Sequence, residues 1–216
     1  MSAVPARTRI KFCGLTRPAD VRRAVALGVD ALGFVLWPAS KRAVDVATLA
    51  ELAAEVPAFV TRVGLFVDAA PELVEQCAPH LDLLQFHGNE SPAECERYGR
   101  AWIKALRMRD GLDLHREAAR YSASSALLLD AYRPGVPGGT GEVFDWSRIP
   151  ATLTKPVILA GGLTPDNIGR AIHQVGPHAV DVSGGIEAFP GGKESAAMAA
   201  FVREVAIANQ TRKTTG

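Results

Sequence analysis

A cysteine and an aspartate each close a short apolar run of this chain. Cys13 follows Ile10, Lys11 and Phe12, and Asp130 follows the run 126–129. Each run is typical of a buried strand that ends in a loop. A thiol and a carboxyl group at the same end of one parallel sheet can act as a base and an acid. If the sheet closes into a barrel, this end is where we expect the chemistry.

Two pairs of glycines follow two later apolar runs and indicate a phosphate site. The first pair is Gly161 and Gly162, and the second, after Ser183, is Gly184 and Gly185. Paired glycines let backbone N–H groups come close to a ligand, and a helix N-terminus adds partial positive charge. Barrels often bind phosphate with the loops after strands seven and eight. Ordinary turns are the alternative interpretation of these glycines.

The surroundings of Cys13 indicate whether this cysteine is packed in the core or has a reactive thiol. A position at a strand end, just before a helix start, can lower the pKa of a thiol toward neutrality. Lys11 lies two residues earlier, so its ammonium group should face the same side of the strand and support a thiolate. Asp181, in the eighth apolar run, is expected to orient its neighbours or to pair with Lys11 or Lys104.

Three further features are weaker candidates. Arg42 lies just beyond the second run, where a guanidinium group could bind a carboxylate through two hydrogen bonds, although a solvated loop arginine is the alternative. Gln85 and His87 end the fourth run, and the histidine is either catalytic or structural. The glycine-rich segment 134–141 suits a lid over the site, and it lacks the ending of a phosphate-binding P-loop.

Eight short, near-continuously apolar runs alternate with amphipathic segments. This alternation predicts an α/β fold and, within it, a single (β/α)8 TIM barrel spanning residues 1–216, because a chain of this length suits one such barrel. The predicted strands are 8–13, 31–36, 62–67, 82–86, 102–106, 126–130, 156–161 and 179–183. A doubly wound open sheet shares the alternation, but a dinucleotide-binding glycine motif does not follow the first run.

Helix start and stop signals lie between the apolar runs. Thr16 is predicted to cap a helix that Gly28 ends, and the residues 164–166 are predicted to start a helix that Gly176 ends. The terminal segments, about 1–7 and 209–216, are polar or irregular, so we expect them to be frayed.

Composition excludes several classes of partner. The net charge of +1 gives no reason to expect nucleic acid or a membrane surface, and 48% hydrophobic residues are ordinary for a globular protein. Apolar runs are all shorter than the roughly 20 residues that span a bilayer, and the first residues lack a signal-peptide pattern. Three widely spaced cysteines predict neither disulfides nor a metal site. We therefore expect a cytoplasmic protein, either a monomer or a homodimer.

The motifs together resemble those of the phosphoribosylanthranilate isomerase family of tryptophan biosynthesis. Each motif is weak alone, but their order and spacing from Lys11 to Glu194 are specific. In chain order they are 11–16, 33–35 with 40–42, 63–67, 84–90, 129–130, 138–141 with 144–146, 159–163 and 181–183. One departure is Gly184, where the family usually has a second serine. The backbone N–H survives this change, but a hydroxyl contact with phosphate would not.

The resemblance implies an Amadori rearrangement that needs an acid and a base but no metal or organic cofactor. Asp130 is then the general acid that protonates the furanose ring oxygen, and Cys13 is the general base that removes the proton from C2. The substrate phosphate would lie against Gly162, Ser183, Gly184 and Gly185, and Arg42 would meet the anthranilate end. The thiol must be partly ionised and the carboxyl group partly protonated near neutral pH.

Other functions on the same barrel stay open at this point. The related isomerase of histidine biosynthesis would be expected to use aspartates and to show two similar halves, whereas this chain has Cys13 on its first run. A pentose-phosphate epimerase would need several metal-binding histidines and aspartates at strand ends, and only His87 fits. A barrel without catalysis, which binds a phosphorylated ligand or a partner protein, is the alternative from a different class. Activity in both pathways is a further possibility.

Overall fold

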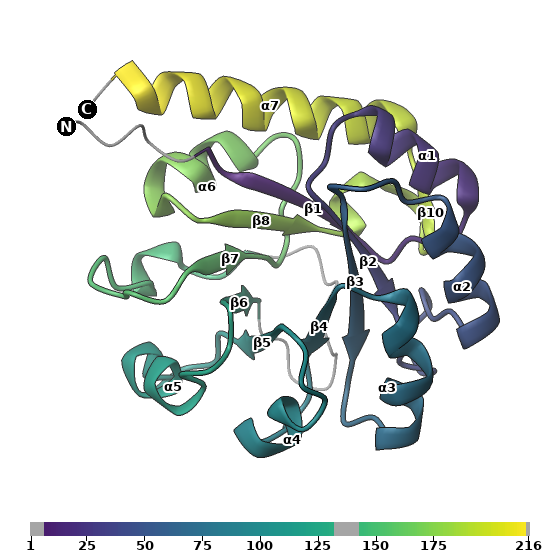
Figure 1. The fold of residues 1–216 in the computed structure, drawn as a ribbon. Coiled ribbons are helices and arrows are strands. Elements are labelled where there is room, and N and C mark those ends of the chain that lie inside the picture. The colour runs from purple at the N-terminus through teal and green to yellow at the C-terminus, as the bar shows by residue number, and fades with distance from the viewer. Residues whose placement is uncertain (1–6, 132–142, 215–216) are drawn as a thin grey trace.

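Eight parallel strands close into a barrel in the order of the chain, with β8 returning to pair with β1. The structure, a computed structural model, describes residues 7–131 and 143–214 (Figure 1). The strands are β1 (Arg9–Cys13), β2 (Ala31–Val35), β3 (Thr61–Phe66), β4 (Leu83–Phe86), β5 (Trp102–Arg107), β6 (Leu127–Asp130), β7 (Val157–Leu159) and β8 (Ala179–Val182). The predicted TIM barrel is therefore confirmed.

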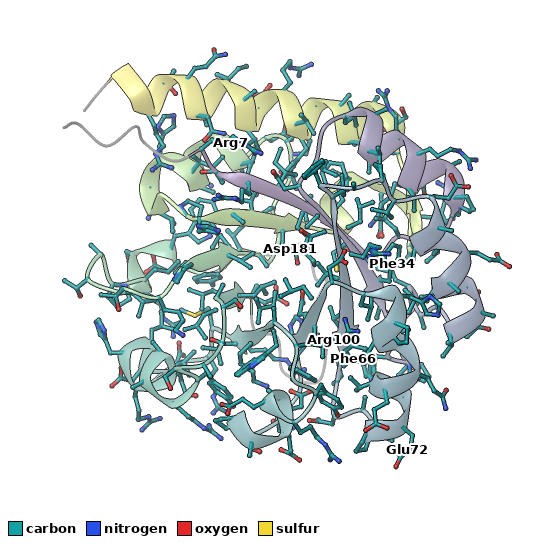
Figure 2. All side chains as sticks on the ribbon, in the orientation of Figure 1. Arg7, Phe34, Phe66, Glu72, Arg100 and Asp181 are labelled. Carbon is teal, nitrogen blue, oxygen red and sulfur yellow. The ribbon has the colours of Figure 1, made fainter. Side chains whose placement is uncertain are left out.

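The strands are mostly apolar because both of their faces are covered. In β6, Leu127 and Leu129 pack outward in the main hydrophobic core, and Leu128 packs inward with a smaller cluster inside the barrel. The same alternation places Phe34 and Phe66 in the outer core, between the strands and the helices around them (Figure 2). A continuous run of leucines thus serves both layers of the fold.

Seven α-helices surround the barrel in the described part of the chain. They are α1 (Pro18–Ala26), α2 (Val46–Ala54), α3 (Pro71–Cys77), α4 (Pro92–Glu96), α5 (Leu114–Arg120), α6 (Ile168–Val175) and α7 (Ser195–Thr214). The helices α1, α2 and α3 lie along the side of β1 to β3, and α7 runs alongside α6 (Figure 1). No helix in the described ranges is long and apolar enough to cross a membrane.

Two of the predicted helix starts are wrong. Arg17, not Thr16, precedes α1, because the Thr16 hydroxyl group donates to the carbonyl of Gly191 instead. Helix α6 begins at Ile168, because residues 165–167 form a turn after the first glycine pair, Gly161 and Gly162. The predicted end at Gly176 is confirmed, and its left-handed backbone conformation ends α6.

The connection from β6 to β7 departs from the expected pattern of strand and helix. Its described part contains a 3-10 helix, η2 (Trp146–Arg148), and no α-helix. The segment 134–141, for which we predicted a lid, lies outside the described residues. After β8, a 3-10 helix, η3 (Gly184–Ile186), leads into a short hairpin of β9 (Glu187–Phe189) and β10 (Gly192–Lys193).

The expected fraying of the C-terminal segment 209–216 is wrong for residues 209–214. Helix α7 continues to Thr214, and the side-chain oxygen of Asn209 accepts a 2.9 Å hydrogen bond from the backbone N–H of Thr8. Arg7 pairs with Asp30 in the loop before β2. The polar residues at the end of α7 therefore hold the start of β1, a contact that polarity alone did not reveal.

Candidate active site

One cavity at the carboxyl end of the barrel brings together the site residues that the sequence predicted. Its volume is about 270 Å³, and Trp37, Leu65 and Val67 form part of an apolar wall. The predicted residues that line it are Cys13, Arg42, Asp130, Gly161, Gly162, Asp181, Ser183, Gly184 and Gly185. The location agrees with the rule that barrel enzymes work at this end.

Cys13 lies beside a buried ion pair that crosses the junction of β1 and β8. The register places Lys11 opposite Asp181, and the Lys11 ammonium group donates a 2.8 Å hydrogen bond to Asp181 Oδ1. Asp181 lies near the centre of the barrel in Figure 2. This arrangement fulfils the expectation that Asp181 pairs with a barrel lysine.

Gly33 makes room for this cluster from the neighbouring strand. It pairs with Cys13 in the β1–β2 register. A Cβ atom on Gly33 would lie 2.8 Å from Cys13 Sγ and 2.9 Å from Lys11 Nζ, closer than real Cβ contacts allow. The absence of a side chain at Gly33 therefore permits the thiol and the ammonium group to lie side by side.

The expected lowering of the Cys13 pKa does not occur. Burial raises the pKa of the Cys13 thiol, and the Lys11 ammonium group opposes this shift without cancelling it, because Asp181 offsets part of its charge. The helix start is also distant, since α1 begins only at Pro18. In this state the thiol is protonated at neutral pH, and its ionisation is the demanding step for a base at this position.

Asp130 lies beside His87, which the sequence left as either catalytic or structural. His87 Nε2 is 3.3 Å from Asp130 Oδ2, and both side chains are almost fully buried. The Gln85 amide nitrogen is 3.3 Å from His87 Nδ1. If that amide donates to Nδ1, the ring proton is on Nε2, which lies near the carboxylate but makes no hydrogen bond to any residue that the structure describes. His87 thus lies beside Asp130 and lines the same cavity.

The loop that carries His87 is held by a second buried ion pair. Lys104 Nζ is 2.6 Å from Glu90 Oε2, and Glu90 also accepts hydrogen bonds from the backbone N–H groups of Gly88 and Asp68. Lys104, which was the other candidate partner for Asp181, therefore serves this loop. It packs on the outer side of β5 and does not reach the cavity.

The two glycine turns lie against each other, as a shared phosphate site requires. A Cβ atom on Gly185 would lie 1.9 Å from the carbonyl oxygen of Leu163, so the two backbones meet directly. Asn167 fixes the first turn by donating to the Gly162 carbonyl at 2.8 Å and accepting from the Thr164 N–H at 2.9 Å. Asn167 was not predicted from the sequence, where a helix start was expected just before it, at residues 164–166.

Arg42 is engaged with a partner that the sequence analysis did not predict. Its Nε and Nη2 atoms donate to the two carboxylate oxygens of Glu187 at 2.8 and 2.7 Å. Lys193 Nζ donates to the same carboxylate at 2.7 Å. Gly14 admits the arginine stem, since a Cβ atom there would lie 2.5 Å from Arg42 Cδ. The one available signal was the presence of Glu187 at the end of the second glycine loop.

Comparisons with known proteins agree with this geometry. The family model described as N-(5'-phosphoribosyl)anthranilate (PRA) isomerase matches residues 10–204. The chain belongs to this isomerase family. A family member from Chromohalobacter salexigens, N-(5'-phosphoribosyl)anthranilate isomerase, is 66% identical over 95% of this chain and 97% of its own length.

Solved structures of the isomerase family share the fold. Phosphoribosyl anthranilate isomerase from Thermotoga maritima has a TM-score of 0.84 and 36% identity, covering 92% of this chain and 98% of its own. Another family structure, in complex with reduced 1-(o-carboxyphenylamino)-1-deoxyribulose 5-phosphate, has a TM-score of 0.78 and 34% identity with the same coverage. In the described ranges, no group of three or more histidine, cysteine or acidic side chains could hold a metal ion.

Proposed function

We propose that the cavity isomerises N-(5-phosphoribosyl)anthranilate to 1-(2-carboxyphenylamino)-1-deoxyribulose 5-phosphate, with Asp130 as general acid and Cys13 as general base. The observation that carries this assignment is the presence of the thiol and the carboxyl group in one cavity, at the ends of β1 and β6. The family to which the chain belongs performs this step in tryptophan biosynthesis.

The first half of the reaction opens the sugar ring. The carboxyl group of Asp130 gives its proton to the furanose ring oxygen while the bond from that oxygen to C1 breaks. The nitrogen lone pair forms the new C–N double bond, which leaves an iminium ion and an Asp130 carboxylate. His87 Nε2 lies 3.3 Å from Asp130 Oδ2 without a hydrogen bond to it, and a small rotation of the ring would let an Nε2 proton stabilise that carboxylate.

The second half moves a proton away from C2. The Cys13 thiolate takes the C2 proton, and the electrons of that C–H bond form the C1–C2 double bond as the iminium charge is neutralised. The resulting enolamine tautomerises to the ketone. The buried Lys11 ammonium group beside Sγ favours the thiolate that this step requires.

The two ends of the substrate are assigned to two different groups of cavity residues. The phosphate lies at the paired glycine turns, where Gly162, Ser183, Gly184 and Gly185 present backbone N–H groups. Arg42 faces the anthranilate carboxylate. The apolar wall that includes Trp37 and Leu65 accommodates the aromatic ring. The substitution of serine by Gly184 leaves the backbone N–H available.

The test is the loss of anthranilate-type fluorescence when the purified protein meets substrate that is generated in situ. Cys13→Ala and Asp130→Asn should retain the fold and substrate binding, and each should lower kcat by about 10²- to 10⁴-fold. Near-normal kcat in Cys13→Ala would refute the base assignment. If a folded sample gives no turnover, the histidine-pathway substrate and then the binding-only barrel should be tested.

We further propose a cytoplasmic enzyme that forms one domain and acts as a monomer or homodimer on this small phosphorylated substrate, without nucleic acid or a membrane as partner. The net charge of +1 supports the absence of a polyanionic partner. Light scattering after size-exclusion chromatography would distinguish monomer from dimer, and any larger assembly would contradict this expectation.

A further inference from the structure

Glu187 is held between two cations at the edge of the cavity. Its carboxylate accepts two hydrogen bonds from Arg42 and one, at 2.7 Å, from Lys193. The Lys193 ammonium group also donates to the carbonyl of Ser183 at 3.2 Å and to its hydroxyl group at 3.4 Å. A continuous chain of contacts therefore joins Ser183, on the phosphate side, to Arg42, on the anthranilate side.

Within this series of contacts, the side chains of Lys193 and Glu187 are buried, and the side chain of Arg42 lines the cavity. The exposed fractions of the side chains are 0% for Lys193, 5% for Glu187 and 18% for Arg42. Burial works against the ionisation of Glu187, but Arg42 and Lys193 outweigh it and hold its pKa below the usual value. The carboxylate is therefore charged at every pH at which the enzyme would be assayed.

The bonding pattern of Arg42 leaves one edge of its guanidinium group for a ligand. Glu187 takes the edge formed by Nε and Nη2. A guanidinium group has five N–H donors, and its other edge, formed by Nη1 and the second N–H of Nη2, can bind another carboxylate through two hydrogen bonds. Arg42 can therefore hold Glu187 and the substrate carboxylate at the same time.

Glu187 could instead compete with the substrate for Arg42, but burial argues against this. A carboxylate that swung away would leave the fully buried Lys193 ammonium group without its counter-ion. Breaking a buried ion pair by removing one partner is strongly unfavourable, because the remaining charge is unpaired in a poorly solvated place. Glu187 thus stays in place when the ligand binds, and Arg42 is fixed before the ligand arrives.

We propose that Glu187 and Lys193 are positioning residues that orient Arg42 for the ortho-carboxylate of the aromatic ring. The pair makes the enzyme selective for substrates with that carboxylate. Through Ser183 it also fixes the separation between this contact and the phosphate loop. This inference rests on the proposed function, because it assigns Arg42 to the anthranilate end of the substrate.

The test compares two inhibitors that differ only in the carboxylate. One is reduced 1-(2-carboxyphenylamino)-1-deoxyribulose 5-phosphate, and the other is the reduced phenylamino counterpart without the carboxyl group. In Glu187→Gln, binding of the carboxylated inhibitor should weaken about tenfold or more, since one oxygen of the bidentate contact is lost. Binding of the phenylamino inhibitor should stay within about twofold. The substrate KM should rise more than kcat falls.

Control variants separate positioning from a loss of structure. Glu55→Gln makes the same change at the exposed ion pair of Arg22 and Glu55, away from the cavity, and should leave both inhibition constants unchanged. If Glu187→Gln fails to fold, Glu187→Gln/Lys193→Met removes both buried charges together. The double variant should show the same selective loss of the carboxylated inhibitor.

Three results would overturn the positioning role. Equal weakening of both inhibitors would show a general structural effect, and tighter binding of the carboxylated inhibitor would show that Glu187 competes with it. These results differ from failure of the proposed function, in which the unaltered chain would neither bind the carboxylated inhibitor nor convert the substrate. Unaltered turnover together with unchanged selectivity in Glu187→Gln would overturn this inference alone.

Discussion

Lys11 donates a 2.8 Å hydrogen bond to Asp181 across the junction where β1 meets β8, and the same ammonium group adjoins the Cys13 thiol. The ion pair thus both joins β8 to β1 and supplies a positive charge beside the reactive sulfur. The two roles of the ion pair can be tested separately, because only its effect on the ionisation of the Cys13 thiol should make activity depend on pH.

We expect Lys11→Met to lower kcat/KM at neutral pH by roughly ten- to a hundredfold, less than the loss of the whole base. Without the cation the thiol pKa rises further, so the loss should shrink as the pH increases. The measurement is the pH profile of kcat/KM. Lys11→Met leaves the buried Asp181 carboxylate without its ion-pair partner, which could impair folding. The double variant Lys11→Met/Asp181→Asn removes that charge as well and serves as the control for folding. A loss of equal size at every pH would argue against the electrostatic role.

The raised pKa of Cys13 predicts slow alkylation in the unliganded protein. The thiolate is the reactive form, and a pKa above the ordinary value leaves little of it at neutral pH. The rate of modification by iodoacetamide should therefore still be rising above about pH 8.5, the usual pKa of a free thiol. Mass spectrometry distinguishes Cys13 from Cys77 and Cys95, for which burial raises the pKa to about 11 and about 12. A plateau below neutral pH would contradict this prediction.

Gly33→Ala should damage catalysis more than its size suggests. The added methyl group would meet Cys13 Sγ at 2.8 Å and Lys11 Nζ at 2.9 Å, so one of them must move. We expect a loss of about 1–3 kcal/mol in the free energy of unfolding from overpacking, together with a clear fall in kcat. Chemical denaturation and turnover assays measure the two effects.

Gly169→Ala is the matched control for that variant. A Cβ atom on Gly169 meets nothing within 4 Å, and the residue lies inside α6. Alanine should stabilise the helix by about 0.5–1 kcal/mol and leave kcat unchanged. If Gly33→Ala behaved like this control, the steric account of the thiol pocket would be wrong.

Asn167→Ala should weaken phosphate binding without a direct contact to phosphate. Its side chain joins the Gly162 carbonyl to the Thr164 N–H, so its loss frees the first glycine turn. The inhibition constant for inorganic phosphate should rise several-fold. Asn209→Ala is the comparison, because that side chain holds Thr8 at the other end of the barrel. It should lower the Tm and leave phosphate inhibition as it was; equal effects of the two variants on phosphate would refute the role of Asn167.

The sequence predicted the parts of this molecule that local pattern determines. The strands could be read because each is covered on both faces, as in the leucines of β6. Cys13 and Asp130 stood out because reactive groups closed apolar runs. The glycine turns were found because each pair directly follows an apolar run, where paired glycines let backbone groups approach a ligand.

The remaining features depend on contacts between distant segments. Thr16 bonds to Gly191, and Arg42 bonds to Glu187, both more than a hundred residues away along the chain. The direction of the Cys13 pKa shift was wrong because burial depends on the packing of several strands. Asn209 was expected to be frayed because its polarity is visible in the sequence and its bond to Thr8 is not.

Closure of the barrel between β1 and β8 also sets an order of events on the ribosome. The first strand emerges early, but its partner Asp181 is made only near the end of the chain. Until then Lys11 has no counter-ion from β8, and one edge of β1 is unpaired, which is the state in which sheets tend to associate wrongly. The growing chain must protect that edge through most of its synthesis, and translation of β8 and the elements after it completes both the fold and the electrostatic setting of the thiol.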